Sequence, residues 1–453
     1  MTSNAPHIGY LPDERPPVWK LLLYALQQVV VMFPATIAVA LITGFHVSTT
    51  IFASGLATIC FLLVTGRKLP LYYGSSFSYL SAIMGLMAAQ AALGKPLNEQ
   101  IAVAQFGIIM SGLVSIAAGF LVKAVGKDVI DKILPASVTG PIAMAIGLTL
   151  AATALGDAAT APTGLAEGTA ALGGNLAWVI SLATLVSTIL FSVYLKGIWS
   201  QLPLLLGPLV GCAVAAIAGQ LSGINFFQSL GGSSSLFALP EFTLPIPSWA
   251  AVVAIMPIAI ATIPESTAHV YQLDIYVNDL SRKKGGKHYN IADKLGLNLI
   301  GDGIGDMVSA FIGGPAGTNY GENISAMAIT KVFSTAVLLT AAVVAMIVSC
   351  FTPLINAIYA IPKAVIGGLE VYLFGAIAAQ GIAIMMDKKT DMFSSKNIAV
   401  IATIMVIGVG GQYKFNGSIP FFGIQVPCIA GAAIFGILLN LLLSIGEKKE
   451  KEA

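Results

Sequence analysis

The sequence has few charged residues. Aspartate, glutamate, lysine and arginine make up 10% of its 453 residues, 57% are hydrophobic, and the mean hydropathy is +0.87. Soluble domains carry about 25% charged residues, so the composition excludes an ordinary soluble domain. The apolar runs recur up to the C-terminus, which excludes a single signal peptide followed by such a domain. The chain is therefore predicted to be an all-α polytopic membrane protein.

The sequence also has few cysteines and a small net charge. The four cysteines are isolated in apolar sequence, and no pair has metal-ligand spacing, so we expect buried free thiols and no metal site. The formal net charge of +2 gives no support for a nucleic-acid surface. No cofactor is expected. An intramembrane enzyme is the alternative from another class, but the sequence has neither an H-E-x-x-H motif nor a recognisable Ser-His-Asp order.

Long apolar segments follow one another along the chain, and a membrane span needs about 20 such residues. We predict fourteen spans, near residues 20–44, 47–65, 73–93, 99–123, 133–155, 177–196, 201–222, 249–275, 291–312, 320–333, 335–358, 363–386, 397–411 and 419–445. An even number of spans places both termini on the same side of the membrane.

The distribution of basic residues tests this span count independently. With a cytoplasmic N-terminus, all of the 23 Lys and Arg residues except Lys95, Lys363 and Lys414 fall on the cytoplasmic side. The long polar connections 156–176 and 223–248 contain no Lys or Arg, and both fall outside. The positive-inside rule requires this asymmetry, which predicts that both termini are cytoplasmic.

Two pairs of short motifs recur in the same order. "YGSSFS" from Tyr73 opens the third span and "YGENIS" from Tyr320 opens the tenth, while "LPASVTG" from Leu134 opens the fifth and "IPKAVIG" from Ile361 opens the twelfth. The chain is therefore predicted to contain two repeats of seven spans. Because seven is odd, the second repeat is inverted in the membrane, as in secondary transporters that bind substrate near the midplane.

The third and tenth spans begin with sequence that is too rich in glycine to be regular helix. Irregular backbone at membrane depth is tolerated where it is buried in protein or lines a cavity. We predict short extended strands near 71–73 and 318–320, followed by half-helices that begin near Ser76 and Glu322. The two helix N-termini would then face the centre and offer free N–H groups and positive dipole ends.

Ionisable residues within these spans mark functional sites by default. Glu265 and His269 are four residues apart in "PESTAHV" and share a helix face, an arrangement typical of a proton relay. The structural alternative is a hydrogen-bonded pair that joins helices, and for Glu322 it is a helix cap. Asp302 and Asp306 share a face of the ninth span, where a site role and a structural role are equally open.

Phe77, at the first half-helix, is the candidate for stacking on a flat ligand, with a core role as the alternative. Two carboxylates and a histidine repel small anions and suit a ligand with N–H donors. The residues alone therefore predict transport of a small polar solute with N–H donors, coupled to protons. A planar neutral heterocycle would fit this description.

The segment "YGENISAMAITK" resembles the signature of the nucleobase–ascorbate transporter (nucleobase–cation symporter) family, in the version typical of bacterial uracil permeases. "GSSFSYLS", "PESTAHV", "RPP" and "GGLEVYLFG" are similar as well, so the resemblance extends from about residue 15 to residue 440. The signature glycine is replaced by Ser325. The Gln-His pair common in the first span is Gln27-Gln28, and some uracil permeases have Tyr where Phe374 stands.

The resemblance implies a core domain (19–128 and 246–358) and a gate domain (129–245 and 359–445), flanked by cytoplasmic segments 1–18 and 446–453. It implies a multi-pass protein of the inner membrane, in contact with lipid, that is homodimeric through the gate domain. The implied activity is uracil import with a proton by alternating access. Xanthine or uric acid transport, sodium coupling and, more remotely, an anion carrier of the related seven-plus-seven fold are the alternatives.

The resemblance also implies roles for individual residues. Glu265 and Glu322 would bind the base, and His269 would tune Glu265 and help proton coupling. Family members that carry purines commonly have Gln at the position of Glu322, which favours uracil. The remaining implied site residues are Phe77 and Gly321 as main-chain contacts, Ala35 lining the site, Tyr320 at its border and Phe374 as gate aromatic. Asp302, Asn323 and Ser325 are expected to form a possible network.

Overall fold

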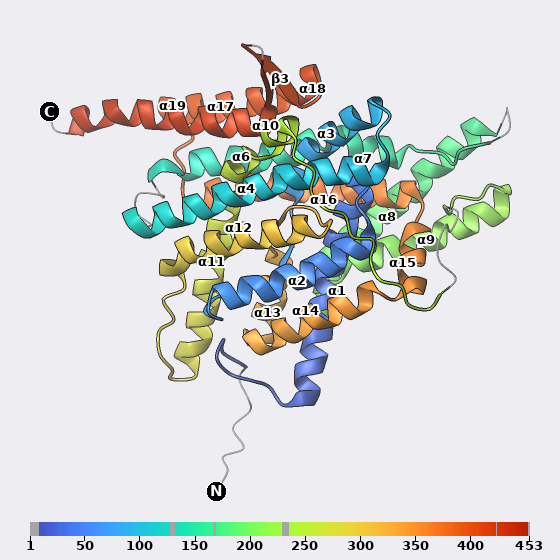
Figure 1. The fold of residues 1–453 in the computed structure, drawn as a ribbon, viewed down its shortest axis with the longest axis horizontal. Coiled ribbons are helices and arrows are strands. Elements are labelled where there is room, and N and C mark those ends of the chain that lie inside the picture. Colours follow the sequence, from blue (N-terminus) through green and yellow to red (C-terminus); the bar gives the residue numbers. More distant parts are fainter. Residues whose placement is uncertain (1–8, 127–131, 166–168, 229–234, 423, 452–453) are drawn as a thin grey trace, which may run out of the picture.

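The computed structural model describes residues 9–126, 132–165, 169–228, 235–422 and 424–451 (Figure 1). The first half of this mostly helical fold contains α1 (Val18–Thr43), α2 (Val47–Val64), β1 (Tyr73–Ser75), the 3-10 helix η1 (Phe77–Tyr79), α3 (Leu80–Ala92), α4 (Leu97–Val125), α6 (Ala136–Thr149), α7 (Ala151–Ala158), α8 (Ala170–Tyr194), η2 (Gly197–Gln201) and α9 (Pro203–Ser222).

The second half contains α10 (Trp249–Ile255), α11 (Ile258–Lys283), η3 (Ala292–Lys294), α12 (Leu295–Phe311), β2 (Gly317–Asn319), α13 (Gly321–Thr330), α14 (Thr335–Ser349), α15 (Thr352–Tyr359), α16 (Lys363–Asp387), α17 (Ser395–Met405), the π-helical segment Val406–Gly410, α18 (Gly411–Phe415), β3 (Ser418–Phe421), β4 (Ile424–Pro427) and α19 (Cys428–Lys451).

Ten helical segments within the described residues are long and apolar enough to cross a membrane, judged by length and composition. Two shorter apolar helices, Phe77–Ala92 and Thr335–Ser349, follow the same pattern over fewer residues. The polytopic helical class is confirmed, whereas the count of fourteen spans stays a prediction. Both motifs of the second repeat pair open a helix, because α6 begins directly after Pro135 and α16 directly after Pro362.

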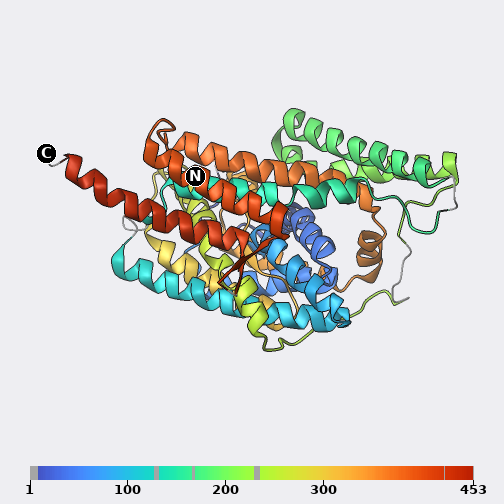
Figure 2. The same cartoon turned by 90° about the horizontal axis from the view of Figure 1, so that it is seen from above.

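The helices pack in two groups. In one, α12 packs against α4 and α2, and α14 packs against α1 and α2; in the other, α16 packs against α6, α7 and α8, and α8 packs against α9. Seen from above, α8 and α9 lie at one end of the molecule and α19 projects at the other (Figure 2). The groups consist of helices from the proposed core and gate domains, although the division at those boundaries stays a prediction.

The strands β1 and β2 come from opposite halves of the chain and pair antiparallel, with Tyr73 opposite Asn319 and Ser75 opposite Gly317. They lie within two residues of the extended segments expected from the sequence. Glycine is required for this close approach. A Cβ atom on Gly74 would lie 2.4 Å from the ring of Tyr320, and one on Gly317 would lie 2.2 Å from the ring of Tyr73.

Replacing Gly317 by alanine is therefore expected to lower the melting temperature of the purified protein. The added Cβ would also lie 2.6 Å from the carbonyl oxygen of Gly74, which is backbone and cannot rotate away. Overpacking of this kind costs about 1–3 kcal/mol. Gly85→Ala is the matched control, because a Cβ there meets no atom within 4 Å. Equal melting temperatures for the two variants would contradict the tight crossing.

The N-terminal segment is tied to the ends of α11 and α13. Tyr10 bridges to Val332 in a parallel arrangement, and the Phe333 N–H donates to the carbonyl of Tyr10 at 2.8 Å. Lys284, directly after α11, donates to both carboxylate oxygens of Glu14 at 2.7 and 2.6 Å. These contacts hold residues 9–14 against the half-helix α13.

The expectation of four buried thiols is wrong for three of them. Cys428 is buried, whereas Cys60, Cys212 and Cys350 are partly exposed on the surface of the helix bundle. A thiol behaves as a small apolar group. Partial exposure among apolar neighbours therefore costs it little.

Candidate substrate site

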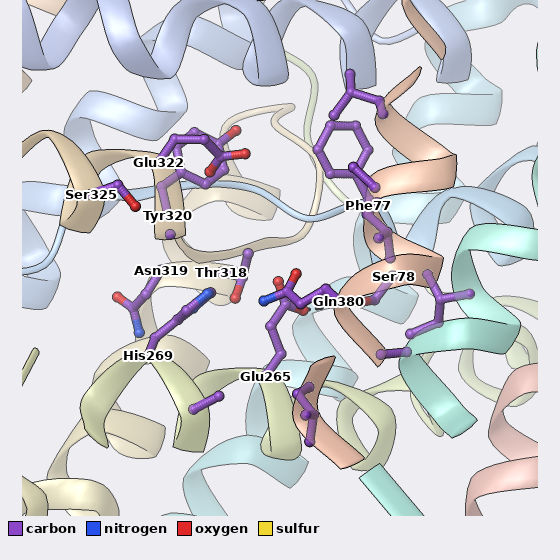
Figure 3. A pocket seen from close by; sticks show the side chains of 18 of the residues that line it. Phe77, Ser78, Glu265, His269, Thr318, Asn319, Tyr320, Glu322, Ser325 and Gln380 are labelled. Carbon is purple, nitrogen blue, oxygen red and sulfur yellow. Dashed lines mark hydrogen bonds between the residues drawn. The ribbon is translucent and has the colours of Figure 1, made fainter. Parts of the chain in front are cut away.

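A cavity of about 510 Å³ lies between the second helix group and elements that belong to the proposed core domain. On one side it is lined by α11, η1, β2 and the first turn of α13, and on the other by α6, α9 and α16. Figure 3 shows the side chains of Glu265 and Glu322 reaching into this space from α11 and α13. The structure thus brings together the two carboxylates that the sequence singled out.

Glu265 and His269 lie on the same face of α11 and both line the cavity, as their spacing of four predicts. The hydroxyl of Ser78, from η1, donates to Oε2 of Glu265 at 3.2 Å and orients the carboxyl group. His269 is 5% exposed, and its Nδ1 has no hydrogen-bond partner within the part of the chain that the structure describes. The pair therefore offers one oriented carboxyl group and one buried imidazole nitrogen that has no hydrogen-bond partner among the described residues.

The helix α13 begins at Gly321. Because glycine has no Cβ, His269 can pack against the N-terminus of this helix. A Cβ on Gly321 would lie 3.0 Å from Nε2 of His269. Glu322 follows in the first turn, where a helix N-terminus stabilises negative charge and presents free N–H groups. Ser325 lies one turn further and also lines the cavity.

Tyr320 borders the cavity from the end of β2. Its hydroxyl shares a 2.9 Å hydrogen bond with the hydroxyl of Thr36 on α1, and its ring covers Gly74. Asn323 points away from the cavity and donates to Oε1 of Gln28 at 2.7 Å. This bond ties the half-helix α13 to α1, so Asn323 positions the site from behind.

The two aspartates of α12 lie behind the crossed strands and outside the cavity lining. Asp302 accepts hydrogen bonds from Ser266 at 2.6 Å, from Asn319 at 2.8 Å and from Asn298 at 3.0 Å. It thereby connects α11, β2 and α12, through partners other than Asn323 and Ser325, the two residues expected to share a network with it. Asp306 accepts from the Tyr73 hydroxyl and from the Gly317 N–H, both at 2.7 Å, and holds the strand pair in place.

Phe77 lines the cavity, with its ring centroid 6.3 Å from that of Phe374 in an edge-on contact. Phe374 itself is only 2% exposed, and Ala35 only 1%. Neither is among the residues that line the cavity in this conformation. Phe374 packs behind Phe77, and the direct roles of Phe374 and Ala35 at the substrate stay predictions.

Several polar residues of the cavity were not singled out from the sequence: Ser78, Gln272, Thr318, Asn319 and Gln380. Figure 3 shows Gln380 extending from α16 toward Glu265. A glutamine within the apolar run of α16 is a signal that could have been noticed, because polar side chains inside a span are costly. Ser78 belongs to the "YGSSFS" motif, but its contact with Glu265 depends on tertiary structure.

The helical fold, the crossed strands and the cavity between the second helix group and the core elements define a membrane carrier of the inverted-repeat type. The murine anion transporter Slc26a9, in its inward-facing state, has the same fold, with a TM-score of 0.68 at 13% identity over 96% of this chain and 69% of that chain. The transmembrane domain of the cyanobacterial bicarbonate transporter BicA matches with a TM-score of 0.61 at 16% identity, over 88% of this chain and 97% of that chain.

The model of the permease family matches residues 19–417, and the chain belongs to this family of membrane transport proteins. It is 35% identical to the uracil permease of Bacillus caldolyticus over 95% of this chain and 94% of that protein. The uracil permease of Escherichia coli K12 is 33% identical (96% and 93% covered). A putative pyrimidine permease of the same strain, RutG, is 32% identical (96% and 91% covered).

Proposed function

We propose that the protein imports uracil together with a proton, by alternating access, across the inner membrane. The observation that carries this proposal is the pair of carboxylates that line one cavity from two different helices, α11 and α13, in a chain that resembles uracil permeases along nearly its whole length. The proposed arrangement is multi-pass with both termini cytoplasmic, and homodimeric through the gate domain.

The chemistry of the cavity complements a uracil ring. Uracil presents two N–H donors and two carbonyl acceptors in one plane. Glu265 and Glu322 accept hydrogen bonds from the N–H groups, and the N-terminal N–H groups at Gly321 face the carbonyls. Phe77 covers one face of the ring. The two carboxylates disfavour anions such as sulfate or bicarbonate, because like charges repel.

The Glu265–His269 pair would couple uracil movement to protons. A protonated Glu265 has one O–H donor and retains acceptor capacity, so it can bind the base through both kinds of hydrogen bond. His269 lies beside it on the same helix face, with a free Nδ1. In this scheme the core helices (19–128 and 246–358) move against the gate helices (129–245 and 359–445), and release of base and proton inside resets the carrier.

A protonophore is expected to collapse the accumulation of radiolabelled uracil in proteoliposomes that are energised by a pH gradient, acid outside. Accumulation is driven by the proton gradient in this scheme, whereas exchange of internal for external uracil needs none and continues. Replacing sodium by potassium should change nothing. Collapse on removal of sodium, with resistance to the protonophore, would show sodium coupling instead. Competition by excess xanthine or uric acid as strong as that by unlabelled uracil would point to a purine carrier.

A further inference from the structure

Glu370 lies in α16, outside the cavity described above. Its side chain is fully buried, with 0% exposure, and neither carboxyl oxygen has a hydrogen-bond partner in the described part of the chain. A buried ionised carboxylate without donors is strongly disfavoured, and such a group takes up a proton instead. No role proposed so far accounts for this residue.

The helices around Glu370 are packed too closely to supply a partner by a small movement. One turn earlier, a Cβ on Gly367 would lie 2.0 Å from the backbone nitrogen of Ala158, at the end of α7. A Cβ on Gly368 would lie 2.3 Å from the carbonyl oxygen of Ser181 on α8. The hydroxyls of Ser181 and Thr184 donate to carbonyls of their own helix and are not available to Glu370.

Two charged groups act on Glu370 electrostatically: Asp157, at the end of α7, and Lys363, in the first turn of α16. Lys363 is two helical turns away along α16, about 10 Å at 1.5 Å per residue, and forms no ion pair with Glu370. The other helices packed against α16 contribute no charged side chain: α6 has no titratable residue, α8 has only Tyr194 and α9 only Cys212. The nearest charge is thus a second carboxylate, which disfavours ionisation of Glu370 further.

We propose that Glu370 is a proton-binding site at the interface of α7 and α16, loaded from the outside through Asp157. Asp157 is partly exposed and lies on the side predicted to be extracellular, where it takes a proton from water. The two carboxyl groups share no hydrogen bond in this structure, so transfer requires α7 and α16 to move apart, after which the Asp157 carboxyl O–H passes that proton to an Oε atom of Glu370. Asp157 is then again a carboxylate and Glu370 a neutral acid; the reverse transfer releases the proton.

A proton is the ligand that this site can accommodate. Hard cations require about six oxygen ligands, and the described residues contain no group of three or more His, Cys, Asp or Glu side chains that could hold a metal ion. Phe374 follows Glu370 by one turn on the same helix and packs against Phe77 in the cavity wall. Loading of Glu370 therefore changes the charge of the gate helix one turn from the proposed substrate site.

Infrared difference spectroscopy of the purified full-length protein tests this site without relying on transport. At neutral pH the wild type should show the C=O band of a protonated carboxyl group that is missing from Glu370→Gln, while the bands of any other protonated acid, such as Glu265, remain in both spectra. Glu241→Gln, an exposed carboxylate as control, should retain the band that Glu370→Gln lacks. Asp157→Asn should retain the band, but the shift of the band after exchange into D₂O should be slower, because this variant lacks the carboxyl group through which protons reach Glu370.

A Glu370→Gln spectrum that loses none of the protonated-carboxyl intensity of the wild type would overturn the proposal, since Glu370 would then be ionised. Glu370→Asp keeps a carboxyl group and should shift the band; this variant decides the matter if the glutamine variant does not fold, and an unshifted band would overturn the proposal equally. The spectroscopic measurement needs no substrate. A negative spectroscopic result would therefore not contradict uracil transport, and a failure to observe uracil transport would not contradict the proton site.

Discussion

Replacing Glu265 by alanine is expected to abolish accumulation of uracil while the protein still folds. The variant loses the acceptor for a substrate N–H, and an unpaired buried donor costs about 1–3 kcal/mol, which corresponds to roughly 5- to 150-fold in affinity. It also loses the proposed proton carrier, so the remaining transport has no driving force. The folded state should survive, because within the described residues the Glu265 side chain takes part in one hydrogen bond, which it accepts from the hydroxyl of Ser78.

Uptake of radiolabelled uracil into proteoliposomes measures this effect, with circular dichroism to establish folding. Glu99→Ala is the control, since that glutamate pairs with Lys95 at the surface. Glu265→Gln separates binding from coupling: it retains a carbonyl acceptor but cannot titrate. This variant should exchange uracil across the membrane without accumulating it against a gradient. Normal accumulation by the alanine variant would remove Glu265 from the site.

Glu322→Ala is expected to have an effect of the same size, and Glu322→Gln should change selectivity as well. In the alanine variant the second N–H of uracil has no acceptor, with a cost of about 1–3 kcal/mol. In the glutamine variant the side-chain amide can donate as well as accept, and the family resemblance associates glutamine at this position with purine carriers. Uracil affinity should fall, and xanthine should compete more effectively than with the wild type.

Competition of bound radiolabelled uracil by xanthine, measured on purified protein, tests this second prediction. Ser325→Ala is a suitable control, because it lines the same cavity one helical turn further along α13. If the glutamine variant retained the affinity of the wild type for uracil and still excluded xanthine, Glu322 would be a helix cap and not a ligand.

The cavity residues that could be predicted from the sequence are those with ionisable side chains in an otherwise apolar span. Glu265 and His269 stand out in an apolar span, and their spacing places them on one helix face whatever the tertiary structure. The glycine-rich run before Glu322 predicts a broken helix, and α13 begins at Gly321 as expected. The strands β1 and β2 lie up to two residues away from the extended segments predicted from the sequence, because pairing between distant segments decides where an extended segment ends.

What escaped prediction depends on contacts between distant segments. Ser78 is unremarkable until η1 is placed against α11, where it donates to Glu265. Asp302 joins three elements, whereas Asp306 holds the crossed strands. Their spacing of four residues does not predict this difference in role. Likewise, only packing reveals that Phe374 lies behind Phe77 in this conformation.

The central claim is that two carboxylates, Glu265 on α11 and Glu322 on α13, hold a flat nitrogenous ring in one cavity. An experimental structure of the protein with uracil bound tests it most directly. The account predicts the ring between Glu265 and Glu322, within hydrogen-bonding distance of both carboxyl groups and with one face against Phe77. Uracil bound elsewhere, or bound here with either carboxyl group turned away from the ring, would contradict it.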